Sequence, residues 1–205
     1  MSPRCLQCFR PVQTCYCRDI IPVDPGIKFV FLMHPNEAYR QKTGTGRLAS
    51  LSLINSEIII DKTFDENRRT QALIANPIYY PMVLYPGKDA GFTATYNFQK
   101  HLSNKTLLIF LIDATWIRAR KMMFRSPSLQ KLPKLSFSAA YRSRFDIKQQ
   151  PEEYCLSTIE SSYYLIKELQ EAKVCPQELK IEGMMRVFEK MVKFQQNCRQ
   201  NRIGI

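Results

Sequence analysis

Several common signatures of enzymes and membrane proteins are missing from this sequence of 205 residues. No run approaches the roughly 20 apolar residues that cross a bilayer, and the first residues lack the apolar core of a signal peptide. Neither a P-loop nor a dinucleotide-binding Gly-x-Gly-x-x-Gly motif occurs, and the two histidines, His34 and His101, stand in no triad pattern. We therefore expect a cytoplasmic protein without a membrane span, and we infer no protein partner.

Acidic residues are also scarce. The sequence contains 18 Asp and Glu residues but 30 Lys and Arg residues, which gives a net charge of +12. Such a surface repels itself unless a polyanion neutralises it, which points to nucleic acid or an anionic membrane. In residues 118–148 nine basic residues stand against one acidic residue, with Phe137, Tyr141 and Phe145 between them. Because this mixture suits backbone phosphates and unstacked bases, we favour nucleic acid over a plain solvated surface.

The seven cysteines are unevenly spread, and four of them lie close together at the N-terminus. Because we expect a cytosolic protein, such a cluster indicates metal binding and not disulfide bonds. Two thiolates on each of two turns are enough to surround a tetrahedral Zn²⁺, although four free or redox-active thiols are the alternative. A closed set of four sulfurs leaves no position for a substrate, so we expect a structural role. The four residues are Cys5, Cys8, Cys15 and Cys17.

The rest of the chain alternates between strand-like and helix-like patterns, which predicts an α/β fold. The run 107–112 holds six consecutive apolar residues, typical of a strand buried on both faces of a parallel sheet. We expect a mostly parallel sheet with flanking helices, in a domain over residues 25–205 that follows a zinc-binding module over residues 1–24. Strands are expected at 27–33, 57–60, 81–85, 107–112 and 134–139, and helices at 47–54, 64–76, 115–125, 156–172 and 176–200.

A carboxylate follows the central apolar run. Asp113 comes directly after residue 112 and shortly before Trp116, the single tryptophan. In open α/β sheets, ligands gather where the strands end, so Asp113 is a candidate functional group. Capping of the helix at 115–125 by the same side chain is the alternative. Ser157 and Glu160 similarly match a capping box, which is a structural role in itself.

Six motifs occur in an order that resembles one family, the DTW-domain proteins, which are tRNA-uridine aminocarboxypropyltransferases. The resemblance covers roughly residues 5–170. Two positions depart from the family pattern, since Ala114 stands where glycine is usual and Gly44 where asparagine is common. The motifs are Cys5-x-x-Cys8 with Cys15-x-Cys17, His34-Pro-x-Glu37, Thr43-Gly-Thr-Gly46, Leu84-Tyr-Pro86, Asp113-Ala-Thr-Trp116 followed by Ala119-Arg-Lys-Met122, and Leu156-Ser-Thr-Ile-Glu160.

The resemblance implies a domain similar to the SPOUT methyltransferases. Whether the chain path is knotted stays an open question at this point. It also implies that S-adenosylmethionine is held by loops at the strand ends. The reaction of the family moves the 3-amino-3-carboxypropyl group onto N3 of a tRNA uridine and releases methylthioadenosine. Carried over to this sequence, the cofactor-binding residues are Thr43, Gly44, Thr45, Gly46, Leu84, Tyr85, Pro86, Thr115, Trp116, Leu156, Ser157, Thr158 and Glu160.

For this chemistry Asp113 is the expected catalytic residue, because the N3 proton of uracil must leave as the nitrogen attacks the carbon next to the sulfonium. Trp116 is expected either to stack on a base or to be an ordinary core aromatic. Two other functions stay open: an RNA methyltransferase that uses S-adenosylmethionine, and a zinc-containing RNA-binding module without catalysis. The expected RNA-binding residues are Arg47, Arg118, Arg120, Lys121, Arg142 and Arg144.

Overall fold

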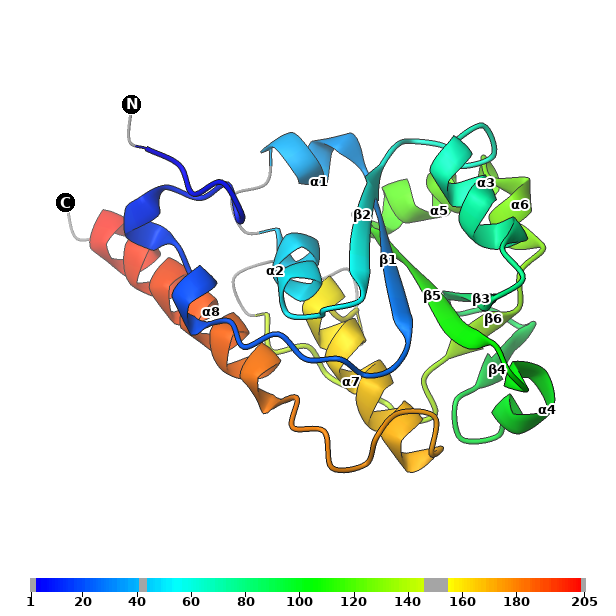
Figure 1. Ribbon diagram of the computed structural model, residues 1–205. Helices are drawn as coiled ribbons and strands as arrows, with labels where there is room; N and C mark the ends of the chain where they lie inside the picture. Colours follow the sequence, from blue (N-terminus) through cyan, green and yellow to red (C-terminus); the bar gives the residue numbers. More distant parts are fainter. Residues whose placement is uncertain (1–2, 41–43, 146–154, 204–205) are drawn as a thin grey trace.

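A six-stranded sheet forms the centre of the fold, and helices cover both of its faces (Figure 1). The computed structural model describes residues 3–40, 44–145 and 155–203. All neighbouring strands are parallel, in the order β2-β1-β5-β3-β6-β4. The predicted α/β class with a parallel sheet is therefore confirmed. The strands are β1 (Lys28–Met33), β2 (Ser56–Ile60), β3 (Tyr79–Leu84), β4 (Ala90–Phe92), β5 (Thr106–Asp113) and β6 (Lys134–Ser136).

The helices form two layers, with α2, α7 and α8 on one side of the sheet and α3, α5 and α6 on the other (Figure 1). None of the helices in the described part of the chain is both long and apolar enough to cross a membrane. Their bounds are α1 (Pro35–Arg40), α2 (Thr45–Leu51), α3 (Arg68–Ala75), α4 (Phe98–Leu102), α5 (Trp116–Phe124), α6 (Pro127–Gln130), α7 (Thr158–Glu171) and α8 (Glu182–Ile203), with 3₁₀ turns at Val12–Thr14 and Cys17–Asp19.

Strand β5 explains why the longest apolar run lies at the centre of the sheet. Successive side chains of a strand point to opposite faces. Leu107, Ile109 and Leu111 pack into the core beneath α2, α7 and α8. Leu108 and Phe110 pack into the second core, beneath α3, α5 and α6. Because both faces are covered, every position of the strand interior has to be apolar.

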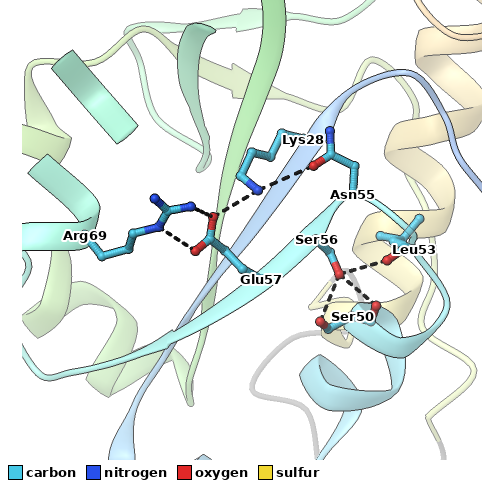
Figure 2. Close-up of polar contacts among 7 residues, drawn as sticks. All are labelled: Lys28, Ser50, Leu53, Asn55, Ser56, Glu57 and Arg69. Carbon is cyan, nitrogen blue, oxygen red and sulfur yellow. Dashed lines mark hydrogen bonds and ion pairs between the residues drawn. The ribbon is translucent and has the colours of Figure 1, made fainter. Parts of the chain in front are cut away.

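The edge of the sheet at β2 carries a charged cluster (Figure 2). Glu57 accepts two hydrogen bonds from the guanidinium of Arg69, at 2.8 and 2.9 Å, and pairs with the ammonium of Lys28 at 2.9 Å. Burial alone would raise the pKa of Glu57, but the hydrogen bonds and charges of Arg69 and Lys28 lower it below its ordinary value. The cluster neutralises Lys28, which is largely buried in the sheet.

Some helix boundaries differ from those predicted. Helix α3 begins at Arg68 instead of residue 64, because the side chain of Asn67 caps it by accepting the Thr70 N–H at 3.0 Å. Phe64 is instead buried in the core ahead of the helix. The last helix begins at Glu182 instead of residue 176.

The N-terminal segment runs alongside α8 (Figure 1). Arg10 donates to the sulfur of Met191 at 3.0 Å, and Lys190 pairs with Asp19 at 2.7 Å. Tyr16 is buried in the same core as α2, α7 and α8. The boundary expected after residue 24 stays a prediction. So does a knotted path, because residues 146–154 lie outside the described residues.

Candidate functional site

A cavity of about 470 Å³ lies at the carboxyl ends of β3, β5 and β6. Its walls come from residues 84–86, 111–116, 135–137, 139–141 and 156–158, with Glu37, Thr45, Ala119, Phe145 and Ser161 completing them. Ligands of open α/β sheets bind at this edge, because the loops that follow parallel strands converge there. The volume lies within the roughly 300–1,000 Å³ of small-molecule sites.

Many of the expected cofactor residues meet at this cavity. Gly44 and Gly46 do not line it, although Gly46 lies directly behind Asp113. Glu160 is fully buried beneath it, and Thr43 lies outside the described residues. The expected residues that do line the cavity are Thr45, Leu84, Tyr85, Pro86, Thr115, Trp116, Leu156, Ser157 and Thr158, together with Asp113.

Asp113 is fixed from two sides. Its Oδ1 accepts a hydrogen bond from the hydroxyl of Thr158 at 2.6 Å, and its backbone carbonyl accepts the N–H of His34 at 3.0 Å. Asp113 is 6% exposed and lines the cavity. The N-cap residue of α5 is Thr115. The Asp113 carboxylate thus joins β5 to α7 at the place where a substrate would sit.

Gly46 permits this position of the carboxylate. A Cβ atom built on Gly46 would overlap Oδ2 of Asp113 and lie 2.5 Å from its Cγ. On Gly44 the nearest atom to such a Cβ is the carbonyl oxygen of Glu37, at 3.9 Å. Only the second of the two motif glycines is therefore required by close approach.

Aromatic rings supply much of the apolar wall of the cavity. The rings of Tyr85 and Trp116 lie 6.3 Å apart at 55°. The rings of Phe137 and Tyr141, in the segment that follows β6, pack edge to face with their centres 5.5 Å apart. Planar groups such as adenine or uracil stack on surfaces of this kind. Trp116 lines the cavity and is half-buried.

Glu160 ties the loop before α7 to the helix. The predicted capping box is present, and Glu160 accepts the N–H of Ser157 at 2.8 Å and its hydroxyl at 2.6 Å. The same carboxylate accepts the N–H of Arg144 at 2.6 Å and the hydroxyl of Ser143 at 2.9 Å. Its partners therefore extend well beyond the local cap.

A second buried glutamate of α7, Glu168, was missed by the sequence analysis. It accepts the N–H groups of Ser138 and Ala139 at 3.0–3.1 Å, and the hydroxyls of Tyr141 and Thr93. The segment that Glu168 holds forms one wall of the cavity. Burial and the bond to Glu168 raise the pKa of Tyr141. The available signal was a carboxylate within the apolar stripe of a helix, since a buried charge needs internal partners.

Arg47 lies between the cavity and the N-terminal cysteines. Its guanidinium carbon lies 4.4 Å above the ring centre of Phe9, a typical cation–π distance. Burial lowers the pKa of Arg47, although the charges of Cys8 and Asp113 oppose that shift. Through Phe9, Arg47 contacts the turn that carries the cysteines.

The other expected RNA-binding residues do not all gather in one place, although Arg118 and Lys121 line the same small hollow. Arg118 lies beside the buried Glu37, with Nη1 and Oε1 3.8 Å apart. Arg144 pairs at the surface with Glu189 at 3.0 Å. The side chains of Arg120, Lys121 and Arg142 are exposed.

The four N-terminal cysteines come together as expected from their spacing. The sulfur atoms of Cys5 and Cys17 are 3.7 Å apart, as are those of Cys8 and Cys15, and all four lie within 4.8 Å of one another. A tetrahedral ion with Zn–S bonds of about 2.3 Å requires sulfurs about 3.8 Å apart. The donor set and its spacing therefore fit a tetrahedral metal.

Comparisons with known proteins agree with the resemblance. The family model of the DTW domain matches residues 2–196. A protein of Drosophila melanogaster named tRNA-uridine aminocarboxypropyltransferase 2 is 30% identical over 167 residues, covering 78% of this chain and 63% of the relative. A Mus musculus protein of the same name is 28% identical over 198 residues, covering 94% and 63%. A Macaca fascicularis protein of that name is 25% identical over 162 residues, covering 77% and 53%.

The chain thus spans under two thirds of the length of these curated relatives. No solved structure matches it.

Proposed function

This chain belongs to the DTW-domain family, and we propose from that premise that it is a tRNA-uridine aminocarboxypropyltransferase. It transfers the 3-amino-3-carboxypropyl group of S-adenosylmethionine to N3 of a tRNA uridine and releases methylthioadenosine. One observation carries the proposal beyond the family match: the segments expected to hold the cofactor converge on a single cavity that contains Asp113. The partner is tRNA and the compartment is the cytoplasm.

Asp113 acts as the general base in this proposal. The bond from uracil N3 to the methylene carbon forms while the carbon–sulfur bond breaks and its electron pair stays on sulfur. The N3 proton passes to the carboxylate of Asp113. Thr158 orients that carboxylate, since it donates to Oδ1 at 2.6 Å. An in-line displacement depends strongly on positioning, which the strand end and the packed helix α7 provide.

The cavity offers groups that suit both substrates. Its aromatic walls, which include Tyr85 and Trp116, match the faces of adenine and uracil. Its carboxylates, Asp113 and Glu37, attract the cationic sulfonium and ammonium groups of the cofactor. The SPOUT-like fold stays a prediction.

The N-terminal cysteines hold a structural zinc ion in this proposal. Four thiolates at tetrahedral spacing leave no open position for a substrate, so the ion stabilises the fold without taking part in the reaction. When bound, the ion would hold the turn that carries Phe9, whose ring contacts Arg47.

The proposed transferase and the two alternative functions can be distinguished by their products. Purified protein is incubated with unmodified tRNA and S-adenosylmethionine, and the nucleosides and small products are identified by mass spectrometry. The transferase yields methylthioadenosine and an aminocarboxypropyl-uridine in equal amounts. Adenosylhomocysteine with a methylated nucleoside would indicate a methyltransferase instead. Binding of tRNA with neither product would indicate an RNA-binding module.

A further inference from the structure

A second, smaller hollow of about 60 Å³ is lined mainly by basic side chains. No acidic residue lines it, so the like charges around it repel one another unless an anion enters. A hollow of this size suits a group of a few atoms. Its lining residues are His34, Lys62, Arg118, Lys121, Met122 and Arg125.

Few carboxylates lie near the basic side chains of the hollow. Arg118 has a carboxylate nearby, but its Nη1 is 3.8 Å from Glu37 Oε1, and Glu37 lines the main cavity. Across residues 3–40, 44–145 and 155–203, no acidic side chain lies within ion-pairing distance of Lys62, Lys121 or Arg125. Within those described residues, three cations therefore line the hollow without a paired carboxylate.

His34, which lines the hollow, adds a hydrogen-bond donor. Its Nδ1 accepts the N–H of Asn36 at 3.1 Å, so in the neutral ring the proton resides on Nε2. Burial and the charges of Arg118 and Lys62 lower the pKa of His34, which favours the neutral ring. The imidazole therefore donates through Nε2 while the surrounding cations supply the charge.

The hollow and the main cavity are neighbours. His34, which lines the hollow, donates its N–H to the carbonyl of Asp113, which lines the cavity. Helix α5 contributes residues to both, since Trp116 lines the cavity and Lys121 lines the hollow. A strand of RNA with one base in the cavity thus has its backbone within reach of the hollow.

We propose that this basic hollow binds a backbone phosphate of the tRNA next to the uridine that enters the main cavity. The identity of the nucleic acid rests on the proposed function. The anion-binding chemistry does not, because it follows from the uncompensated cations and the Nε2–H donor of His34. Lys62 and Arg125 are the new residues of this site, and both are exposed at its rim.

The test compares two double variants with the same loss of charge. Lys62→Ala/Arg125→Ala removes two cations from the hollow. Lys100→Ala/Lys105→Ala removes two cations near the opposite end of β5, where Lys105 directly precedes the strand. The tRNA affinity of each variant and of the unmodified protein is measured over a range of salt concentrations.

We expect the hollow variant to lose at least tenfold in tRNA affinity. We also expect the slope of log affinity against log salt to fall by about 1, because one phosphate contact is lost. The Lys100/Lys105 variant keeps the slope of the unmodified protein. Equal affinity and slope in the two variants would overturn the proposal. A loss of S-adenosylmethionine affinity in the hollow variant would also overturn it, since the hollow would then serve the cofactor.

Inorganic phosphate separates a general anion site from an RNA site. In the unmodified protein, phosphate shifts the His34 imidazole resonances, and in the hollow variant it does not. Such a shift without any loss of tRNA affinity would overturn the assignment to RNA. Formation of methylthioadenosine by the unmodified protein is measured in parallel. Its absence would count against the proposed function alone, whereas the affinity comparison decides the phosphate site.

Discussion

The hydroxyl of Thr158 donates a hydrogen bond to Oδ1 of Asp113, with the two oxygens 2.6 Å apart. This contact joins the last residue of β5 to the first residue of α7 across a sequence separation of 45 residues. It holds the carboxylate at the cavity without neutralising it, because a hydroxyl donates a hydrogen bond and carries no charge.

Asp113→Asn is expected to lower the rate of methylthioadenosine formation by about 10²–10⁴-fold, the usual contribution of a general base. The amide keeps the shape of the side chain and still accepts from Thr158, so tRNA binding is retained. Thr158→Val keeps the base but removes its donor, and a loss of up to about tenfold is expected from a hydrogen bond of this kind. Thr158→Ser restores the rate. Full activity of Asp113→Asn would rule out Asp113 as the base.

Gly46→Ala is expected to displace the Asp113 carboxylate, because the added Cβ would lie 2.5 Å from its Cγ. Overpacking of this kind costs about 1–3 kcal/mol in the free energy of unfolding, measured with urea. The matched control is Gly44→Ala, where the nearest atom is 3.9 Å away and φ is −60°. Equal stability and activity in the two variants would contradict the inferred close approach.

Glu168→Gln is expected to loosen the wall formed by residues 136–141, since an amide NH₂ replaces one of two accepting oxygens. Lost bonds to a buried charged group cost about 1.5–3 kcal/mol. The KM for S-adenosylmethionine should rise more than kcat falls, because Glu168 positions the wall and does not touch the reacting atoms. Glu171→Gln, an exposed change on the same helix, should alter stability by less than about 0.5 kcal/mol. A change in kcat alone would argue against a positioning role.

The purified protein, kept under reducing conditions, is expected to contain one zinc ion per chain by elemental analysis. Cys8→Ser should lower the zinc content and the melting temperature, because a structural ion contributes to folding. Cys198→Ala is the control, since Cys198 lies outside the four-cysteine cluster. Absence of near-stoichiometric zinc or iron from the unmodified protein would remove the metal assignment.

Glu57→Gln tests the charged cluster at the edge of the sheet. The pKa of Glu57 is lowered in the folded protein, so its carboxylate stabilises the fold above the unfolded pKa of about 4.3. That contribution disappears as the pH falls through the lower, folded pKa. We expect the variant to be about 1–2 kcal/mol less stable at neutral pH, and the difference to shrink in acid.

The control for this cluster is Glu189→Gln, whose partner Arg144 forms an exposed pair. Its effect should stay below about 1 kcal/mol at any pH. A loss of stability in Glu57→Gln that is the same at neutral and acidic pH would contradict the role of its charge.

Much of the fold could be predicted from local sequence. The apolar run at 107–112 required a strand buried on both faces, because alternate side chains would otherwise face water. The spacing of Cys5, Cys8, Cys15 and Cys17 similarly brought four sulfurs together on two turns. Strand β4 (Ala90–Phe92) was not predicted, since three residues are too few to show a period.

The sequence predicted the motifs of the candidate site, but not the contacts that hold those motifs in place. The carboxyl ends of parallel strands meet at one edge, so Asp113 and Leu84–Pro86 could be expected near each other. Nothing local in the sequence indicates that Gly46 lies against Asp113, that Glu168 holds Ser138, or that Lys62 and Arg125 share a hollow. Those relationships join residues far apart in the chain, and only the packing of α2, α5 and α7 on the sheet brings their side chains together. Periodicity and spacing fix which face a residue occupies, whereas tertiary packing decides which residue it meets there.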